Sequence, residues 1–166
     1  FPTKRKRKLD IIIDVETIGV FRPGYTPNRK VKPNILAEMN GQKIGKKEKE
    51  EIDSKMIISN AIFNVGITVQ HKGKVLESEQ FGINEFWEYP EHRILDFYRK
   101  NFAKDGSEFS ERYDTFGEFL KKVFYPMLTH YGKYNEITLW SYNADFDRRA
   151  FVDTAKLENM YIPEPI

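Results

Sequence analysis

The chain has 166 residues, of which 40% are hydrophobic and 14% aromatic, and its formal net charge is +2. This length and composition fit a domain with its own core and exclude an intrinsically disordered chain. Cysteine is absent, which excludes disulfides and thiolate metal sites, and no apolar run approaches the roughly 20 residues that a membrane helix needs. We therefore expect a single domain over residues 1–166 that makes no membrane contact.

A basic run, Lys4 to Lys8, comes before the first apolar segment. The simplest interpretation is a solvated terminus. The alternatives are contact with a phosphate backbone and a nuclear address. We expect a cytoplasmic protein, and the run leaves a nuclear location open.

The first predicted strand is Leu9 to Gly19, in which three isoleucines lead into two carboxylates, Asp14 and Glu16. Side chains alternate faces along a strand, so the two acids share a face. Neighbouring acids on a buried strand repel each other and lose hydration, which favours a bound cation. The alternative is an acidic strand end that backbone amides, lysine or arginine satisfy.

Residues 20–55 read as a charged insertion within the domain, with a short helix over Lys47 to Lys55. Connections of this length are uncommon inside compact domains and are often functional. A polyanion contact and a plain solvated loop are equally compatible with its basic residues, which are Arg22, Arg29, Lys30 and Lys32.

Two further strands are predicted over Ile62 to Gln70 and Val75 to Phe81. The short link between them contains Gly73, as a hairpin turn does. With the first strand they form a predicted three-stranded antiparallel meander.

Helices are predicted next, over residues 90–102 and from Asp114 or Thr115 onward, with a loop over residues 105–110 between them. Pro126 should kink the second helix, and Gly132 should end it. An apolar stripe recurs at helical spacing in the second helix and is interpreted as core: Phe116, Phe119, Leu120, Val123, Phe124, Met127, Leu128 and Tyr131.

The last predicted strand, Ile137 to Tyr142, is interpreted as buried and parallel to the first, after a right-handed crossover. Asn143 ends it, and Asp145 is the predicted N-cap of a helix that runs to about Asn159. Asp147 then lies in the first helical turn.

Asp147 is therefore expected above the strand end that carries Asp14 and Glu16. Three converging carboxylates make an oxygen-rich site that suits Mg²⁺ or Mn²⁺. Two such ions about 4 Å apart activate a water and stabilise the leaving oxygen of a phosphodiester.

The sequence DVET after an apolar strand, a later IFNVG strand and NADFD after another strand together resemble the DnaQ-like (DEDD) 3′–5′ exonuclease superfamily. Asp14 and Glu16 fall on its first motif, D-x-E. Asn143, Phe146 and Asp147 fall on its second, N-x-x-F-D. The resemblance implies a ribonuclease-H-like fold, two metal ions and removal of nucleotides from the 3′ end of a single strand.

By this resemblance Asp14 would bridge both metals, Glu16 would hold the ion that activates water, and Asp147 would hold the ion near the leaving group. Discrimination of DNA from RNA depends on contacts to the 2′-hydroxyl, which the sequence leaves open. We also expect substrate contacts from five residues in or beside the two motifs: Thr17, Asn143, Phe146, Arg148 and Arg149.

The third motif of the family supplies a His or Tyr base and a fourth acid, and residues 148–166 contain no such pattern. His130 precedes the second motif, and Asp153 lies in the same predicted helix as Asp147. We therefore expect a domain that is incomplete at its C-terminus, without the base and the fourth ligand. The activity of this chain by itself stays open.

The predicted fold is α/β, with a ribonuclease-H-like mixed sheet flanked by helices. The sheet has strand order 3-2-1-4 and a fifth strand that is missing or supplied elsewhere. The predicted function is divalent-metal-dependent 3′–5′ exonucleolysis of DNA or RNA, with a polymerase or replication protein as a further partner. The alternative is a non-catalytic nuclease-like module that binds nucleic acid or protein.

Two other enzyme classes fit the sequence less well. A phosphatase of the haloacid dehalogenase type needs Asp where Glu16 stands. A P-loop fold needs a glycine-rich phosphate loop, which is absent from the sequence.

Overall fold

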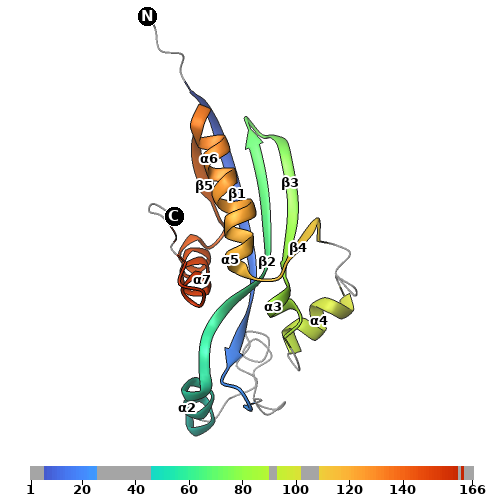
Figure 1. Cartoon of the computed structure of the whole chain (residues 1–166), viewed down its shortest axis with the longest axis vertical. Helices are drawn as coiled ribbons and strands as arrows, with labels where there is room; N and C mark the ends of the chain where they lie inside the picture. Colours follow the sequence, from blue (N-terminus) through green and yellow to red (C-terminus); the bar gives the residue numbers. More distant parts are fainter. Residues whose placement is uncertain (1–5, 26–45, 90–92, 102–108, 161, 163–166) are drawn as a thin grey trace, which may run out of the picture.

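The structure is a computed structural model that describes residues 6–25, 46–89, 93–101, 109–160 and 162 (Figure 1). These residues form a five-stranded mixed sheet with the order β4-β3-β2-β1-β5. Pairing is antiparallel for β1–β2 and β2–β3, and parallel for β1–β5 and β3–β4. The strands are β1 (Arg7–Phe21), β2 (Met56–His71), β3 (Lys74–Ile83), β4 (Glu111–Tyr113) and β5 (Asn135–Trp140).

The strand order differs from the predicted one because β4 extends the sheet beyond β3. Its three residues pair with Phe81–Ile83 of β3 and lie next to the segment that was predicted as a loop. Three residues are too few to show the alternation of apolar and polar side chains that marks a strand. β4 is a strand only because it pairs with β3. It is thus an additional strand at the β3 edge, and the fifth strand expected after the last predicted strand stays a prediction.

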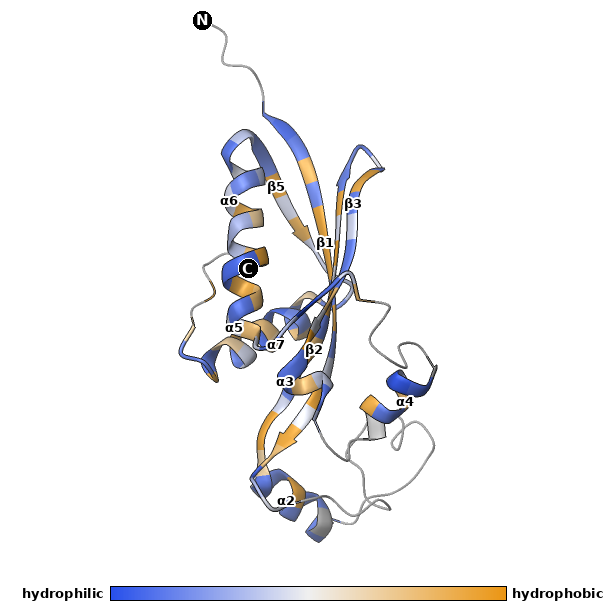
Figure 2. Cartoon of the chain, turned by 45° about the vertical axis from the view of Figure 1, so that its right-hand side comes forward, coloured by the Kyte–Doolittle hydropathy of each residue, from blue (hydrophilic) through white to orange (hydrophobic). Residues whose placement is uncertain are grey.

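Alternating side chains explain why β1 and β2 pair in this register. In β1, Leu9, Ile11, Ile13 and Val15 are buried, while Asp14 on the opposite face is exposed. Figure 2 shows this alternation of hydrophobic and hydrophilic residues along the strands. The register is strongly specified because a slip by one residue would expose the whole apolar set.

The β2–β3 hairpin turns at Lys72 and Gly73, which both have positive φ, 50° and 76°. Two successive residues of this kind make a primed turn, whose twist matches the flanking strands. The predicted hairpin is confirmed, and with it the antiparallel pairing of the first three strands.

Beyond Glu16 the register of β1 and β2 shifts three times, and Phe63 is left without a partner on β1. The two strands continue as a ribbon toward the helix α2 (Lys46–Lys55), where Arg22 N donates to Lys55 O at 2.9 Å (Figure 1). The short helix predicted inside the insertion is therefore present. The basic residues Arg29, Lys30 and Lys32 lie outside the described residues, as do Lys4 and Arg5 of the basic run.

The predicted second helix is found as α5 (Phe116–Phe119), a π-helical turn η1 (Leu120–Phe124) and α6 (Tyr125–Tyr134). Thr115 is its N-cap and accepts a hydrogen bond from Glu118 N at 3.1 Å. Pro126 has no N–H to give to the preceding turn, and the wide π-turn directly before it accommodates this loss.

The predicted end at Gly132 is wrong, because α6 continues to Tyr134 and its C-cap is Asn135. The Asn135 amide donates to Tyr131 O at 2.8 Å and satisfies one of the free carbonyls of the last turn.

The core lies between the sheet and the helices α5, η1, α6 and α7 (Ala144–Lys156), which cover one face. Phe124 and Phe151 have ring centroids 5.1 Å apart, and Phe81 and Phe119 lie 5.5 Å apart. Phe116 and Leu120 are fully buried. The interpretation of the apolar stripe as core is therefore confirmed for its most buried members.

The other face is covered only at one end, by α3 (Asn84–Trp87) and α4 (Arg93–Asn101). An aromatic cluster joins these helices to the sheet, with Phe63 and Tyr98 centroids 5.4 Å apart. Farther along this face, Ser78 and Thr138 are exposed, so that half is open to solvent in the described chain. None of the described helices is long and apolar enough to cross a membrane.

The prediction that the last strand is buried is wrong, because β5 is an edge strand. Its exposure alternates, and Trp140 keeps 56% of its surface accessible. Tyr142, beyond the strand end, is fully exposed. A short, mainly apolar segment such as Ile-Thr-Leu-Trp has the same sequence pattern in an edge strand as in a central strand.

Candidate acidic site at the ends of two parallel strands

The two acids of β1 lie just past the point where β5 ends. The last pair between these parallel strands is Ile12 with Trp140, so Asp14 and Glu16 have β2 on one side only. Asp14 is exposed and Glu16 is half-buried. The space on the β5 side is taken by the start of α7, and ends of parallel strands are where α/β sheets commonly bind ligands.

The entry into α7 places Asp147 in the first turn of the helix. The Asn143 side chain caps this helix by accepting from Phe146 N at 3.4 Å, and Asp147 N donates to Asn143 O at 3.0 Å. The predicted cap, Asp145, is instead the second residue of the helix. Asp147 itself is only 8% exposed.

The carboxylates of Asp14 and Glu16 on β1 influence the ionisation of Asp147. Burial, and after it the negative charges of Asp14 and Glu16, together raise the pKa of Asp147 to about 6. A carboxylate is repelled in this way only by charges within a few ångströms to about a nanometre. The three acids singled out in the sequence thus come within electrostatic range of one another.

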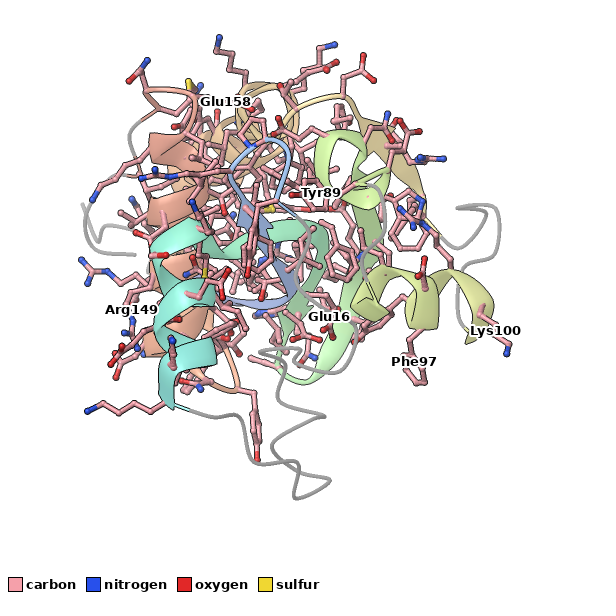
Figure 3. The ribbon with its side chains drawn as sticks, turned by 90° about the horizontal axis from the view of Figure 1, so that it is seen from below. Glu16, Tyr89, Phe97, Lys100, Arg149 and Glu158 are labelled. Atoms are coloured by element: carbon pink, nitrogen blue, oxygen red, sulfur yellow. The ribbon has the colours of Figure 1, made fainter. Side chains whose placement is uncertain are left out.

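Glu16 has a partner that the sequence did not reveal. Burial raises its pKa, a hydrogen bond from the Tyr98 hydroxyl lowers it, and the charge of Asp14 raises it. Burial and the two carboxylates raise the pKa of Tyr98 well above its usual range, so Tyr98 is a protonated donor. Figure 3 shows Glu16 between α7, which carries Arg149, and α4, which carries Phe97 and Lys100.

No signal in the sequence marks Tyr98 as part of this site. It belongs to an apolar helical pattern with Leu95, and its ring packs against Phe63. The hydroxyl reaches Glu16 only because α4 docks on the uncovered end of the sheet face.

The ion pairs Arg99–Asp96, Arg112–Glu88 and Lys122–Glu118 do not involve the acids of β1. The alternative that backbone amides, lysine or arginine satisfy this strand end stays a prediction. Tyr98 satisfies Glu16 in part, and the repulsion on Asp147 remains.

The donor chemistry fits a hard divalent cation, but the side chains do not form a ready metal site. Carboxylate oxygens and uncompensated negative charge suit Mg²⁺ or Mn²⁺. Within the part of the chain that the structure describes, no three His, Cys, Asp or Glu side chains are close enough to share one ion. Asp14, Glu16 and Asp147 would hold the ions after side-chain rearrangement.

A cavity of about 120 Å³ adjoins Asp147. Ser141 lies in its wall, and its buried hydroxyl oxygen has no hydrogen-bond partner among the described residues. The walls are otherwise mainly apolar, formed by Ile13, Leu139, Trp140, Ala144, Arg148 and Phe151.

The five expected substrate contacts have different surroundings. Asn143 is explained by its role as a helix cap, and Phe146 packs against the core. Thr17 is half-buried at the first register shift of β1. Arg149 Nε donates to Asp145 O at 3.4 Å, and Arg148 is exposed beside the cavity.

The remaining titratable candidates lie elsewhere. His71 is at the hairpin end of β2, where its Nδ1 lies 2.9 Å from Lys8 O. His130 is in α6 and packs on Tyr131. Asp153 accepts a hydrogen bond from Asn60 at 3.3 Å, and His92 lies outside the described residues.

Comparisons with protein-family models, with curated proteins and with solved structures find no match to this chain. We therefore infer the chemistry of the site from its own residues.

Proposed function

We propose that the protein is a divalent-metal-dependent 3′–5′ exonuclease acting on DNA or RNA, with a DnaQ-like active site on a ribonuclease-H-like sheet. One observation carries the proposal: Asp147, from the helix after β5, is buried within electrostatic range of Asp14 and Glu16 on β1. The parallel pairing of β1 and β5 produces this arrangement, and the order of the two acidic motifs along the chain supports it.

In this proposal Asp14, Glu16 and Asp147 hold one or two Mg²⁺ or Mn²⁺ ions. When bound, such ions activate a water and stabilise the leaving oxygen of a phosphodiester. Tyr98 keeps the carboxylate of Glu16 oriented through its hydroxyl. Arg148, exposed beside Asp147, is placed to meet a substrate phosphate.

The substrate is the 3′ end of a single strand, and a polymerase or other replication protein is a further proposed partner. A cytoplasmic location, with a nuclear one as the alternative, belongs to the same proposal. None of these is needed for the chemistry of the site.

The second candidate is a non-catalytic nuclease-like module that binds nucleic acid or protein. It is favoured by the absence, among the described residues, of three side chains that share a metal position. The hydrogen bond from Tyr98 also occupies one ligand of the proposed site. The two candidates differ in whether Mg²⁺ or Mn²⁺ binds at Asp14, Glu16 and Asp147.

The direct test is release of nucleotides from an oligonucleotide labelled at its 3′ end. We expect degradation with Mg²⁺ or Mn²⁺, none in EDTA, and a loss of at least about a hundredfold for Asp14→Asn. The matched control is Asp145→Asn, an equal change of charge at an exposed acid in the first turn of α7. Equal activity of Asp14→Asn and the wild type would rule out the proposed mechanism.

Metal binding separates the enzyme from the module. Crystals soaked in Mn²⁺ should show anomalous density within reach of Asp14, Glu16 and Asp147. Absence of that density, together with a lack of nuclease activity, would favour the non-catalytic module.

A further inference from the structure

The end of the sheet farthest from α2 collects positive charge. There β1 and β5 begin, the β2–β3 hairpin turns and α6 ends (Figure 1). Among the described residues of this end, six exposed basic side chains define what we call the basic end: Lys6, Arg7, Lys8, Lys72, Lys74 and Lys133. None of the ion pairs between described residues involves any of them.

The acids near the basic end do not cancel it. Glu77 accepts a hydrogen bond from the Tyr131 hydroxyl at 2.6 Å, and Glu136 is exposed beside Lys8 on β5. Two more acids lie close by: Glu79, whose charge also acts on Tyr131, and Asp10, two residues from Lys8. Six cations therefore face four acids, so the field at this end is still positive and attracts polyanions.

An exposed tryptophan lies between the basic end and the acidic site. Trp140 pairs with Ile12 across β1 and β5, so both side chains share the open face of the sheet with Asp10 and Asp14. Its indole Nε1 donates to Asp10 Oδ1 at 2.8 Å, which fixes the ring while 56% of the side chain stays accessible. A fixed, exposed aromatic ring is suited to stacking on a nucleobase.

The rest of this face is polar and uncovered along the same line. Thr68 and Ser78 hydrogen-bond to each other across β2 and β3 at 3.0 Å, and Ser78 is exposed. From Arg7 to Asp14 the strand rises roughly 23 Å at about 3.3 Å per residue. A single strand of about four nucleotides, the lower end of known site sizes, spans such a distance.

We propose that a single-stranded nucleic acid binds along this open face, with its phosphates on the basic end and one base stacked on Trp140. Its 3′ end points toward Asp14, Glu16 and Asp147. That direction rests on the proposed exonuclease function, whereas binding itself needs neither metal nor cleavage. Charge complementarity favours this polyanion, and the fixed indole supplies a base contact that a bare anionic surface does not use.

Binding is tested with the intact chain in EDTA, by fluorescence anisotropy of a 5′-labelled 12-nucleotide single strand. The double variant Lys72→Glu/Lys74→Glu should weaken binding by at least tenfold and flatten the salt dependence. The matched control, Lys46→Glu/Lys47→Glu in α2 at the opposite end of the described chain, should stay within about twofold of the wild type. Equal losses in both double variants would overturn the proposed position.

Stacking is tested through the intrinsic fluorescence of the two tryptophans. In a Trp87→Phe background, added oligonucleotide should quench Trp140. Trp140→Leu should weaken binding by about five- to tenfold, and Trp140→Phe should restore part of it, as loss and recovery of one stacked base require. No quenching, or no difference between Leu and Phe, would overturn the stacking contact.

The direction is tested by photocrosslinking. Because Trp140 pairs with Ile12, only two residues from Asp14, a 5-iodouracil at the second nucleotide from the 3′ end should crosslink to Trp140, and one at the second nucleotide from the 5′ end should not. The reverse pattern would overturn the path. Equal binding of vesicles containing phosphatidylserine, lost with the same lysines, would assign the basic end to a membrane instead.

The outcomes distinguish this inference from the proposed function. If binding depends on the basic end and Trp140 but no nucleotides are released in Mg²⁺, the proposed binding surface is supported and the proposed exonuclease activity is excluded. If nucleotides are released and these variants do not change the rate, the exonuclease activity is supported and the proposed binding surface is excluded.

Discussion

Asp147 is a residue whose surroundings oppose its charge. It is nearly buried, and the two negative charges on β1 add to the effect of burial. The fold brings a carboxylate into this position although an amide would fit without repulsion. Functional sites often keep such residues at the expense of stability.

Replacing Asp147 by Asn should therefore stabilise the metal-free protein at neutral pH. The folded-state pKa of Asp147 is raised from 3.8 to about 6, so the folded state holds this proton more tightly than the unfolded state. Stability consequently falls as the pH rises from about 4 to about 6 and stays low above that. Asp147→Asn should gain about 1 kcal/mol at pH 7.5 and nothing at pH 4, as measured by thermal unfolding in EDTA.

The control for this prediction is Asp145→Asn. Asp145 is exposed in the first turn of α7, where a negative charge favours the helix dipole, so its removal should give no gain. Added Mg²⁺ should raise the melting temperature of the wild type and have little effect on Asp147→Asn. A variant no more stable than the wild type at pH 7.5 would contradict the repulsion.

At the scale of elements, the N-cap of α7 determines where Asp147 lies. Asn and Asp are both good N-caps, and Asn143 and Asp145 compete for the role in the sequence. The end of β5 at Trp140 resolves the choice, because the chain must turn within three residues to pack α7 on β2. Asn143 becomes the cap, and Asp147 then faces the strand end.

Asn143→Ala should therefore destabilise the protein by about 1 kcal/mol, whereas Asn143→Asp should keep most of the stability. Urea denaturation at constant pH measures both. If Asn143 acts only as a cap, Asn143→Asp also retains any nuclease activity. Loss of activity in a stably folded Asn143→Asp variant would instead assign Asn143 a substrate contact.

The elements that could be predicted from the sequence are those with long, regular patterns. The alternation in β1 and β2, the Gly73 hairpin and the aromatic stripe beginning at Phe116 were sufficient to predict their structure. The short elements β4 and α3 were missed, because three or four residues hold no period and tertiary contacts define them.

The candidate site divides in the same way. The acids Asp14, Glu16 and Asp147 could be proposed because strand ends and helix starts are local signals. Tyr98 could not, because its hydrogen bond to Glu16 depends on how α4 docks across the sheet. The exposure of Trp140 was also missed, since edge and central strands carry the same short apolar run.

At the scale of the whole molecule, a pair of carboxyl groups joins three distant segments. Glu85 in α3 accepts from Phe116 N at 3.1 Å, and Glu158, just after α7, accepts from Gly117 N at 2.7 Å. A side chain at Gly117 would displace the carboxylate of Glu158 from this position. The first turn of α5 is thus held from both sides of the fold.

Partial burial, a hydrogen bond with Glu158 and its charge raise the pKa of Glu85 to about 7. Below that pH, protonated Glu85 donates to the carboxylate of Glu158 and links the two segments. Above it, two carboxylates face each other at the same helix start. The junction between α3, α5 and the end of α7 should therefore loosen as the pH rises toward 7.

Glu85→Gln should remove this part of the pH dependence. The folded-state pKa lies above the unfolded value of 4.5, so the contribution to stability is complete at low pH and is lost as the pH rises to about 7. Glutamine keeps a donor for Glu158 and cannot ionise, so the variant should match the wild type at pH 5 and melt at a higher temperature at pH 8. Because Glu85 is exposed, solvent screens the repulsion and the gain should be modest. Glu158→Gln should give a similar gain, and the double variant should add little to either one, since a single repulsion is removed in all three. Additive gains, or the same difference at pH 5 and pH 8, would show that the two carboxyl groups do not act as a pair.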